Sequence, residues 1–269
     1  NDLPMKLGVI GCGKMGRALV GGILNNGVVT PEDTVVFDTY TPAAESMATD
    51  LGVQLASSNA EVISSSDVAL LCVKPQGFIE MLGDIGNSKG KLLISIAAGI
   101  QIDSIESAIE GRHRVVRVMP NTPALVGRGA AGFALGTHAT ADDATLTKSL
   151  LGSTGYVCEV SEQDLDAVTA LSGSGPAYIF LMIEALVAGG IEQGLSPAIA
   201  SELATHTVSG AAELLLQSAE SPTQLRENVT SPNGTTFAAL ESFRADQFES
   251  IVKRAVTAAA DRSRELGQA

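Results

Sequence analysis

The sequence predicts an α/β amino-terminal domain with a doubly wound, mainly parallel sheet, followed by an all-α carboxy-terminal domain (residues 1–160 and 161–269). Short apolar runs of strand type alternate with helix patterns up to a small-residue break, LSGSGPAY, at residues 171–178. After this break the pattern contains helices and no further strand. Alternating strands and helices favour a parallel sheet, whereas consecutive helices favour a separate helical layer.

The first strand and the turn after it indicate a nucleotide-binding unit. Residues 6–10 form a short apolar run, residues 11–16 read G-x-G-x-x-G, and a helix pattern follows over residues 17–26. The three glycines permit a tight turn, close approach of a pyrophosphate, and close packing of the helix on the strand. Between a strand and a helix this spacing predicts a Rossmann-type fold. The expected cofactor-binding residues here are Gly11, Gly13, Lys14, Met15 and Gly16.

Asp38 ends the second predicted strand, residues 34–37. In a Rossmann unit an acidic residue at this place accepts hydrogen bonds from the ribose hydroxyls, and its charge repels a 2′-phosphate. The sequence therefore favours NADH over NADPH, although Thr39 and Thr41 can accommodate a phosphate. The alternative is that Asp38 only caps the turn or helix that follows.

Further predicted strands cover residues 68–73, 92–96 and 115–118, with weaker candidates at 132–135 and 156–160. Small and polar residues follow the strands, and ligands of doubly wound folds bind at the carboxyl ends of the strands. For Lys74, solvent exposure and ligand contact fit equally well. The residues expected to line the crevice are Val73, Lys74, Pro75, Ala97, Ala98, Gly99, Asn121 and Pro123.

The second half is a series of helix patterns. They cover residues 162–170, 177–194, 196–218 and 221–229, then a segment that begins near Phe237, and a last helix to residue 266 that Asp246 is expected to cap. The helix at 177–194 is apolar nearly all round, as expected in a core or a subunit interface. We expect these helices to form a homodimer.

Composition excludes several classes of function. The net charge of −13 argues against a nucleic-acid or anionic-membrane surface. The longest apolar stretch, residues 177–195, is interrupted by Glu184 and Glu192, so no membrane span is expected, and no signal-peptide pattern opens the chain. The three cysteines lack metal-ligand spacing, which predicts no metal site and a cytoplasmic location.

The helical half offers few acid–base groups. Lysine is absent between Lys148 and Lys253, and the histidine in that stretch, His206, is interpreted as packed or surface-exposed. Such a site suits a substrate that is already electrophilic, such as a protonated cyclic imine, because hydride delivery then needs positioning more than proton transfer. The hydroxyl of Thr236 can orient the imine nitrogen. The N–H groups of residues 233–236 can hold a carboxylate, although a plain interhelical turn is the alternative.

Several motifs together resemble the pyrroline-5-carboxylate reductase family over essentially the whole chain. The specific ones are residues 171–178 and NVTSPNGTT at 228–236. Residues 8–13, 73–75, 97–99 and 119–123 resemble the same family in the same order. The chain departs from the family pattern at Asn233, where glycine is usual, and at Asp38, where serine or a basic residue is frequent. Asn tolerates a left-handed conformation, so the loop is expected to survive.

The resemblance implies NAD(P)H-dependent reduction of Δ1-pyrroline-5-carboxylate to L-proline, the last step of proline biosynthesis. It implies that Thr236 hydrogen-bonds the substrate nitrogen and that Gly234 and Thr235 hold the carboxylate. Glu162 is implied to lie near the substrate of a neighbouring subunit, and Asn59 and Asn228 to contact the cofactor. The glycine-rich break and the loop contribute the remaining expected substrate residues, Ser174, Gly175 and Ser231. Family members are dimers built by carboxy-terminal helices, and five dimers can form a decamer.

Two other functions remain open on the residues alone. A β-hydroxyacid dehydrogenase shares the layout of the first half but needs a lysine on the helix after the break, and residues 178–193 contain none. A non-catalytic dinucleotide-binding sensor would keep the fold, yet it has no use for a hydroxyl that orients a substrate nitrogen.

Overall fold

The computed structural model describes residues 4–268 and divides the chain into two compact units. The first extends to Ser174 and includes the residues from Ala259 onward; the second is Gly175–Ala258. The boundary between the units thus follows residue 174, fourteen residues after the boundary expected at residue 160. The last turns of the chain belong to the first unit. The segment before the division packs with the sheet because Leu165 and Ala170 are buried there.

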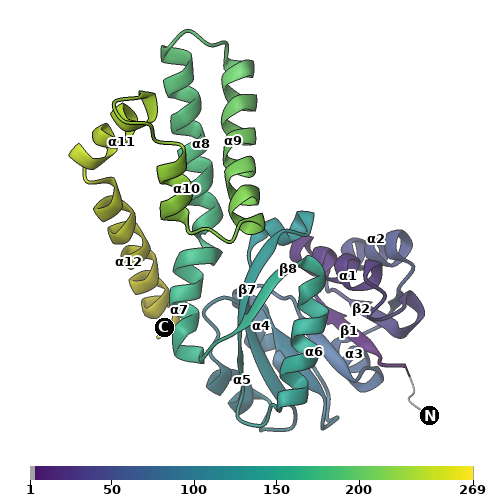
Figure 1. Cartoon of the computed structure of the whole chain (residues 1–269). Helices are drawn as coiled ribbons and strands as arrows, with labels where there is room; N and C mark the ends of the chain where they lie inside the picture. Colours follow the sequence, from purple (N-terminus) through teal and green to yellow (C-terminus); the bar gives the residue numbers. More distant parts are fainter. Residues whose placement is uncertain (1–3, 269) are drawn as a thin grey trace. The chain divides into compact units, whose positions relative to one another are not determined.

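The first unit is built on an eight-stranded sheet with the order β3-β2-β1-β4-β5-β6-β7-β8. All neighbours are parallel except β6 and β7, which are antiparallel. This confirms the predicted doubly wound, mainly parallel sheet (Figure 1). The two-residue β3 was missed, since so short a strand has no periodicity. The strands are β1 (Leu7–Ile10), β2 (Thr34–Phe37), β3 (Gln54–Leu55), β4 (Val68–Leu71), β5 (Leu92–Ser95), β6 (Arg114–Met119), β7 (Gly129–Leu135) and β8 (Gly155–Glu159).

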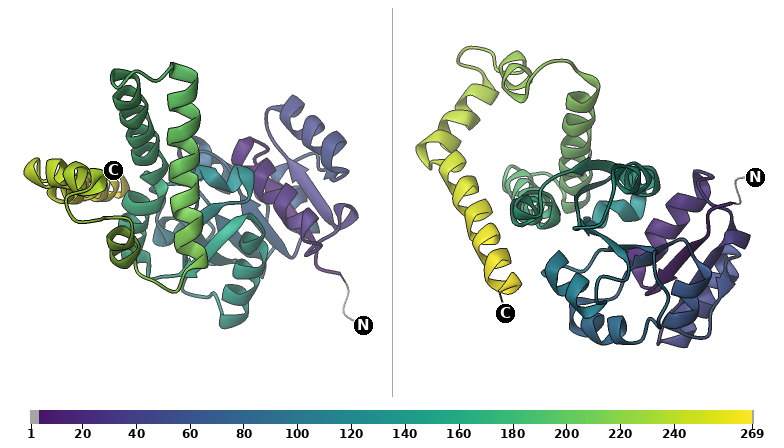
Figure 2. Two further views of the ribbon diagram at one scale, coloured as in Figure 1. Left: turned by 45° about the horizontal axis from the view of Figure 1, so that its top comes forward. Right: turned by 90° about the horizontal axis from the view of Figure 1, so that it is seen from below.

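Helices cover both faces of this sheet (Figure 2). Successive strand residues point to opposite faces, so Leu70 belongs to one buried cluster and Leu71 to the other. Both faces are apolar because parallel strands are covered on both sides. The helices of this part are α1 (Lys14–Asn25), α2 (Thr41–Leu51), α3 (Asn59–Ser65), α4 (Pro75–Gly83), α5 (Ile102–Ala108) and α6 (Ala141–Leu151).

A short helical segment leads from the sheet to the second unit. Helix α7 (Leu165–Val168) continues into a π-helical turn over Thr169–Gly173, closed by a hydrogen bond from the Ser174 N–H to the Thr169 carbonyl at 2.7 Å. π-helical turns are rare and occur frequently at functional sites. Here the turn coincides with the small-residue break.

The second unit is helical, as predicted. Its helices are α8 (Gly175–Glu192), α9 (Pro197–Gln217), α10 (Pro222–Asn228), α11 (Thr235–Ala245) and the first part of α12 (Phe248–Gly267). Side chains of Ser196 and Ser221 cap α9 and α10, which confirms both expected starts. Helix α11 begins at Thr235, close to Phe237 as expected. One expectation was wrong: Asp246 ends α11 through its N–H instead of capping α12.

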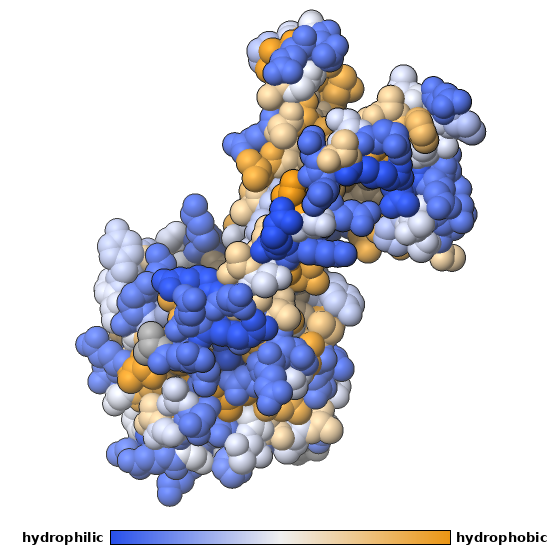
Figure 3. Space-filling model, turned by 90° about the vertical axis from the view of Figure 1, so that its left-hand side faces the viewer, coloured by the Kyte–Doolittle hydropathy of each residue, from blue (hydrophilic) through white to orange (hydrophobic). Residues whose placement is uncertain are grey.

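Helices α8 and α9 pack side by side, yet none of the residues of α8 is buried. Phe180 and Leu181 are 61% and 66% exposed, and hydrophobic patches are visible on the surface of the helices (Figure 3). The helical run Glu162–Glu192 is long and apolar enough to cross a membrane by length and composition. The expectation that no stretch reaches this length was wrong on that criterion. One such helix is weak evidence for a membrane span, because a helix in a subunit interface has the same composition.

Candidate active site

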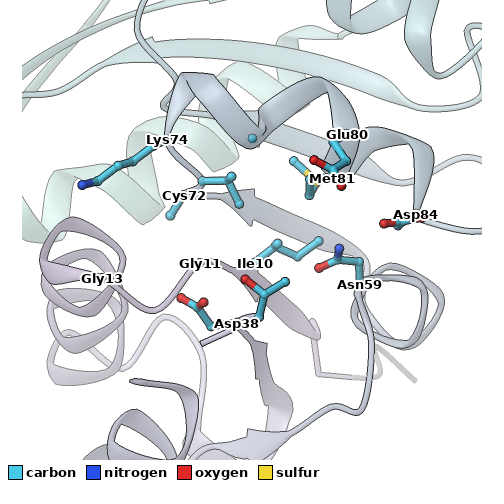
Figure 4. A pocket seen from close by; sticks show the side chains of 13 residues that line it. Ile10, Gly11, Gly13, Asp38, Asn59, Cys72, Lys74, Glu80, Met81 and Asp84 are labelled. Atoms are coloured by element: carbon cyan, nitrogen blue, oxygen red, sulfur yellow. The ribbon is translucent and has the colours of Figure 1, made fainter. Parts of the chain in front are cut away.

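A cavity of about 460 Å³ opens at the carboxyl ends of β1, β2 and β4 in the first unit. Figure 4 shows its lining side chains, which come from the glycine-rich loop, the end of β2, the start of α3 and helix α4. Ligands of doubly wound folds bind at this edge of the sheet. Six expected cofactor residues line the cavity: Gly11, Gly13, Asp38, Asn59, Val73 and Lys74.

The backbone of the glycine-rich loop packs too closely on its neighbours to admit a side chain at two of its glycines. A Cβ on Gly11, which has a φ of +99°, would lie 2.5 Å from the carbonyl oxygen of Cys72, and one on Gly16 would collide with the Gly11 carbonyl. Helix α1 begins directly after Gly13 and has no side-chain cap and no acidic residue in its first turn. The N–H groups of a first turn have no partner within the helix, so those of Lys14, Met15 and Gly16 are of the kind that can bind an anion.

The Asp38 carboxylate organises the turn after β2, which was one of the two roles that the sequence left open; its contact with a ribose stays a prediction. One carboxylate oxygen accepts a hydrogen bond from the Cys12 N–H at 2.7 Å, and the other accepts one from the Tyr40 N–H at 2.8 Å. The carboxylate thus fixes the glycine-rich loop and the turn after β2, while it lines the cavity. Each oxygen keeps a second lone pair, which a ribose hydroxyl can use.

Asn59 supplies a buried polar group to the cavity. The residue is 8% exposed, and its side-chain oxygen is a buried acceptor without a partner among the described residues. Buried polar atoms are normally hydrogen-bonded, so this oxygen indicates a ligand group or water at that place. Together with the glycine-rich cradle it shows that the cavity fits a dinucleotide.

Sequence reasoning missed the part of the lining that comes from α4. Gly77, Glu80, Met81 and Asp84 face the cavity, and their spacing of three and four residues is that of one helix face. This spacing could have identified these residues from the sequence, because α4 begins at Pro75, directly after the expected crevice residue Lys74. Glu80 and Asp84 add two carboxylates to that of Asp38, against the single lysine. Ile10 and Cys72 complete the missed lining, while Thr39, named from the sequence as able to accommodate a phosphate, also lines the cavity.

The two cysteines near the cavity are not nucleophiles. Burial, followed by the charge of Asp38, raises the pKa of Cys12 to about 12. Burial, followed by the nearby Cys12, raises the pKa of Cys72 to about 12 as well. A thiol reacts as the thiolate, so the reactive form of both side chains is disfavoured near neutral pH. All three cysteines are unpaired, and among residues 4–268 no group of His, Cys, Asp or Glu is arranged to hold a metal ion.

The other expected cofactor residues lie outside this cavity. Pro75 starts α4. The Asn121 amide donates to the Ser172 carbonyl at 3.0 Å and accepts from the Ala130 N–H at 2.8 Å, so it braces the break. Pro123 lies in a 3₁₀ turn. Three further residues follow β5: Ala97 is buried, Ala98 is exposed, and Gly99 has a φ of +75°.

Glu162 is held inside the first unit. Its Oε1 accepts from the Arg117 guanidinium at 2.9 Å and from the Ile102 N–H at 2.7 Å. Ser174 closes the π-helical turn, and Gly175 starts α8. The role of these three residues near a substrate stays a prediction.

The expected substrate loop forms one turn in the second unit. Asn233 has a φ of 57°, which confirms that Asn adopts the left-handed conformation there. Gly234 then stands at the start of α11 without a side-chain cap, and its N–H donates to the Ser231 carbonyl at 3.1 Å. Thr235 and Thr236 form the first turn of α11, which contains no acidic residue. The loop is therefore a helix start with two hydroxyls and N–H groups that lack intrahelical partners.

Two further polar residues of this unit are accounted for. The Asn228 amide binds Glu220 and Gln224 at 2.8 and 2.9 Å. His206 is exposed and lies 3.3 Å from Glu202, which confirms a surface position.

Known proteins resemble this chain over its full length. The family model described as pyrroline-5-carboxylate reductase dimerisation matches residues 162–266, and one described as NADP oxidoreductase, coenzyme F420-dependent, matches residues 6–99. The pyrroline-5-carboxylate reductase of Methanosarcina acetivorans is 40% identical over 265 residues, which is 98% of each chain. The enzyme of Arabidopsis thaliana is 41% identical over 98% of this chain and 96% of its own. This chain belongs to the pyrroline-5-carboxylate reductase family.

Solved structures of the family agree with the fold. The reductase from Coxiella burnetii superimposes with a TM-score of 0.93 at 35% identity and covers 98% of this chain and 99% of its own. The Plasmodium falciparum family member, solved with NADP bound, gives 0.84 at 33% identity and covers 98% of both chains. Within this family the amino-terminal unit is the NAD(P)-binding domain and the helical part is the dimerisation domain.

Proposed function

We propose that this chain is an NAD(P)H-dependent oxidoreductase that reduces 1-pyrroline-5-carboxylate to L-proline, the last step of proline biosynthesis. The observation that carries the proposal is the start of α11, where a hydroxyl pair stands beside uncapped backbone N–H groups. This turn offers an anion site and a hydrogen-bonding hydroxyl within a single helix turn. The substrate carries a carboxylate and a ring nitrogen, which call for those two groups.

The substrate carboxylate is assigned to the backbone of Gly234 and Thr235. The positive end of the α11 dipole favours an anion there, and the absence of an acidic residue from its first turn removes a competitor. Ser231 accepts the Gly234 N–H through its carbonyl and so fixes the turn. Ser174, Gly175 and Glu162 are proposed as further substrate contacts, on the resemblance to the family.

Thr236 is assigned as the residue that orients the ring nitrogen. When bound, the nicotinamide cofactor supplies a hydride to the imine carbon. The protonated imine already carries the positive charge that the hydride neutralises, so the reaction forms one C–H bond and leaves an amine. The chain therefore needs no general acid at this step, which agrees with a helical unit without lysine before Lys253. Thr236 contributes by holding the nitrogen in place.

The cofactor is assigned to the cavity of the first unit. The N–H groups of Lys14, Met15 and Gly16 receive the pyrophosphate, and Asp38 and Asn59 receive the ribose hydroxyls. The remaining proposed contacts are Gly11, Gly13, Val73, Lys74, Pro75, Ala97, Ala98, Gly99, Asn121, Pro123 and Asn228.

NADH is the proposed preferred form. Asp38, Glu80 and Asp84 line the cavity, against the one lysine Lys74. Three carboxylates disfavour the dianionic 2′-phosphate of NADPH, since like charges about 4 Å apart repel by about 1 kcal/mol in water and more in a partly buried site.

The proposed assembly is a homodimer through the carboxy-terminal helices, with a decamer of five dimers as the larger form. The exposed apolar side chains of α8 support the dimer, and the decamer rests on the family resemblance. A cytoplasmic location stays a prediction, supported by the three unpaired cysteines.

Oxidation of NADH and of NADPH with pyrroline-5-carboxylate tests the function. Turnover with either cofactor supports it, and no turnover with both defeats it. Thr236→Ala should lower kcat/KM by about 10- to 100-fold if the hydroxyl acts in the transition state. Thr257→Ala is the matched control, because the Thr257 hydroxyl binds only the carbonyl one turn earlier in α12. Equal kinetics of both variants would remove Thr236 from the mechanism.

A sensor that binds the cofactor without turnover remains the second candidate. The buried Asn59 oxygen and the glycine-rich cradle would serve it equally well. Cofactor binding in a titration, combined with no reduction of any cyclic imine, would favour it. A β-hydroxyacid dehydrogenase is disfavoured, since α8 carries no lysine.

A further inference from the structure

Arg117 is a buried cation that the proposed mechanism does not use. It lies in β6, its residue is 8% exposed, and its guanidinium donates to Glu162 Oε1 at 2.9 Å. The ion pair itself adds little stability, because the Glu162 side chain is 34% exposed and solvent screens it, while burial costs Arg117 much of its hydration. Stability alone therefore does not explain a buried arginine within the sheet.

Glu162 connects Arg117 to the loop between β5 and α5, residues 96–101. The same oxygen that binds Arg117 accepts the Ile102 N–H at 2.7 Å, at the first residue of α5. Gln101, at the cap position of α5, provides no side-chain cap. The carboxylate of Glu162 takes that place from 60 residues away in sequence. The end of the loop is thus fixed by a side chain that Arg117 orients.

The beginning of the loop is anchored beside the same arginine. Ser95, which is fully buried, accepts the Ala97 N–H through its hydroxyl at 3.2 Å. In the sheet register Ser95 is the partner of Arg117, so both residues stand at one level of neighbouring strands. The loop is therefore held at both ends from one place in the sheet, with the left-handed Gly99 between them.

The carboxy-terminal turn of α12 lies against this loop as well. A Cβ on Gly267 would be 3.3 Å from the Gln101 amide nitrogen and 4.0 Å from the Gly99 carbonyl oxygen. Ser263 in the same helix donates to Asp166 in the segment after Glu162, at 2.6 Å. The loop is thus supported from its outer side by the end of the chain.

The loop of residues 96–101 follows the strand adjacent to those that border the cavity. The cavity opens at the ends of β1, β2 and β4, and β5 is the neighbour of β4 in the sheet. A dinucleotide whose adenosine half occupies the cavity continues across the switch point towards the following strand. The small residues of the loop then face the other half of the cofactor.

We propose that Arg117 is a positioning residue for hydride transfer, which fixes through Glu162 the loop that receives the nicotinamide ring. The inference rests on the proposed function, in so far as a nicotinamide cofactor is the ligand. Arg117 itself touches neither substrate nor cofactor. Its loss should disturb the nicotinamide end and leave the adenosine end unchanged.

The test compares NADH with ADP-ribose, which lacks the nicotinamide ring. Calorimetric titration of Arg117→Met should give an ADP-ribose Kd within about twofold of wild type, and an NADH Kd that approaches that of ADP-ribose. Single-turnover reduction of pyrroline-5-carboxylate should slow by about 10- to 100-fold, as expected when reacting groups are misplaced. Arg117→Lys, which keeps the charge, should recover part of both losses.

Arg114→Met is the matched control. Arg114 lies on the same strand as Arg117 and forms an ion pair with Asp143 of α6, at 2.8 Å. This variant should lower the melting temperature and leave the two affinities in their wild-type ratio. A parallel loss of both affinities in Arg117→Met, or wild-type binding and transfer, would overturn the proposal. So would equal wild-type Kd values for NADH and ADP-ribose.

If wild type binds NADH but reduces no imine, the proposed function fails while the binding comparison still decides the role of Arg117. If Arg117→Met does not fold, Arg117→Lys and Glu162→Gln carry the binding comparison, which does not involve the substrate that Glu162 is proposed to contact. An unchanged NADH affinity relative to ADP-ribose in both variants would then overturn the proposal.

Discussion

Replacing Asp38 with serine separates the two roles of its carboxylate. The variant loses the hydrogen bonds from the Cys12 and Tyr40 N–H groups. The Tyr40 contact is exposed and contributes little, whereas the Cys12 N–H is partly buried, and leaving such a donor unpaired costs about 1–3 kcal/mol. Binding of both cofactors should weaken, because this donor belongs to the loop that is proposed to hold the pyrophosphate.

The variant also removes a negative charge from the ribose end of the cavity. Unit charges about 4 Å apart repel by about 1 kcal/mol in water and about 4 kcal/mol at an effective dielectric constant of 20. A value near the lower end, about 1.4 kcal/mol, already shifts the ratio of kcat/KM for NADPH over NADH by about tenfold. The expected result is thus a lower kcat/KM with NADH and a ratio shifted towards NADPH by tenfold or more.

Initial rates with both cofactors, measured side by side, provide the assay. Asp84→Asn is the control, since it removes a charge from the same cavity without a hydrogen bond to the glycine-rich loop. It should shift the ratio less and leave the NADH rate unchanged. A folded Asp38→Ser variant with an unaltered ratio refutes the electrostatic argument. A wild-type enzyme that favours NADPH by tenfold refutes the proposed preference.

Three other outcomes follow from single features. Gly11→Ala should abolish cofactor binding in a titration, because its Cβ would meet the Cys72 carbonyl at 2.5 Å and its φ is +99°; Gly27→Ala, also at positive φ but with open space around it, is the control. Burial lowers the pKa of His113 to about 4. As the pH falls, the unfolded chain therefore takes up a proton on His113 before the folded chain does. The free energy of unfolding should thus decrease between about pH 6.5 and pH 4, by roughly 3 kcal/mol at most. His113→Gln should flatten that part of a melting-temperature profile. Light scattering should give at least a dimer mass, and a monomer would contradict the interface prediction.

The fold was predictable because its strands are long enough to show a pattern and each is followed by a turn signal. The antiparallel pairing of β7 was not predictable, since the small residues Gly129–Leu135 carry no information about direction. The start of α11 was predictable only approximately, near Phe237, because threonine is typical of turns as well as of first helical turns. In the structure Thr235 and Thr236 occupy the first turn, where helix propensity matters least.

The site was predictable where the chain has a local motif and was missed where residues meet through the fold. The glycine-rich loop and Asp38 are adjacent to strands and follow a known spacing. Glu80 and Asp84 reach the cavity only because α4 turns one face towards it. Arg117 and Glu162 are 45 residues apart, and their pairing depends on the sheet register, which a single sequence does not reveal.

The helical unit links assembly to the proposed chemistry. Within Gly175–Ala258 the buried hydrophobic residues are Ala200 and Ala204, whereas large apolar side chains of α8 and α9 are exposed. A unit that buries so little apolar surface is not stable alone, because burial must offset the entropy of ordering the chain. The turn that carries Thr236 belongs to this unit. We therefore predict that its geometry depends on a partner that covers the exposed helices, while the cavity proposed for the cofactor belongs to a unit with two apolar clusters of its own. On this prediction, dimerisation is a condition for the proposed substrate loop and not for cofactor binding.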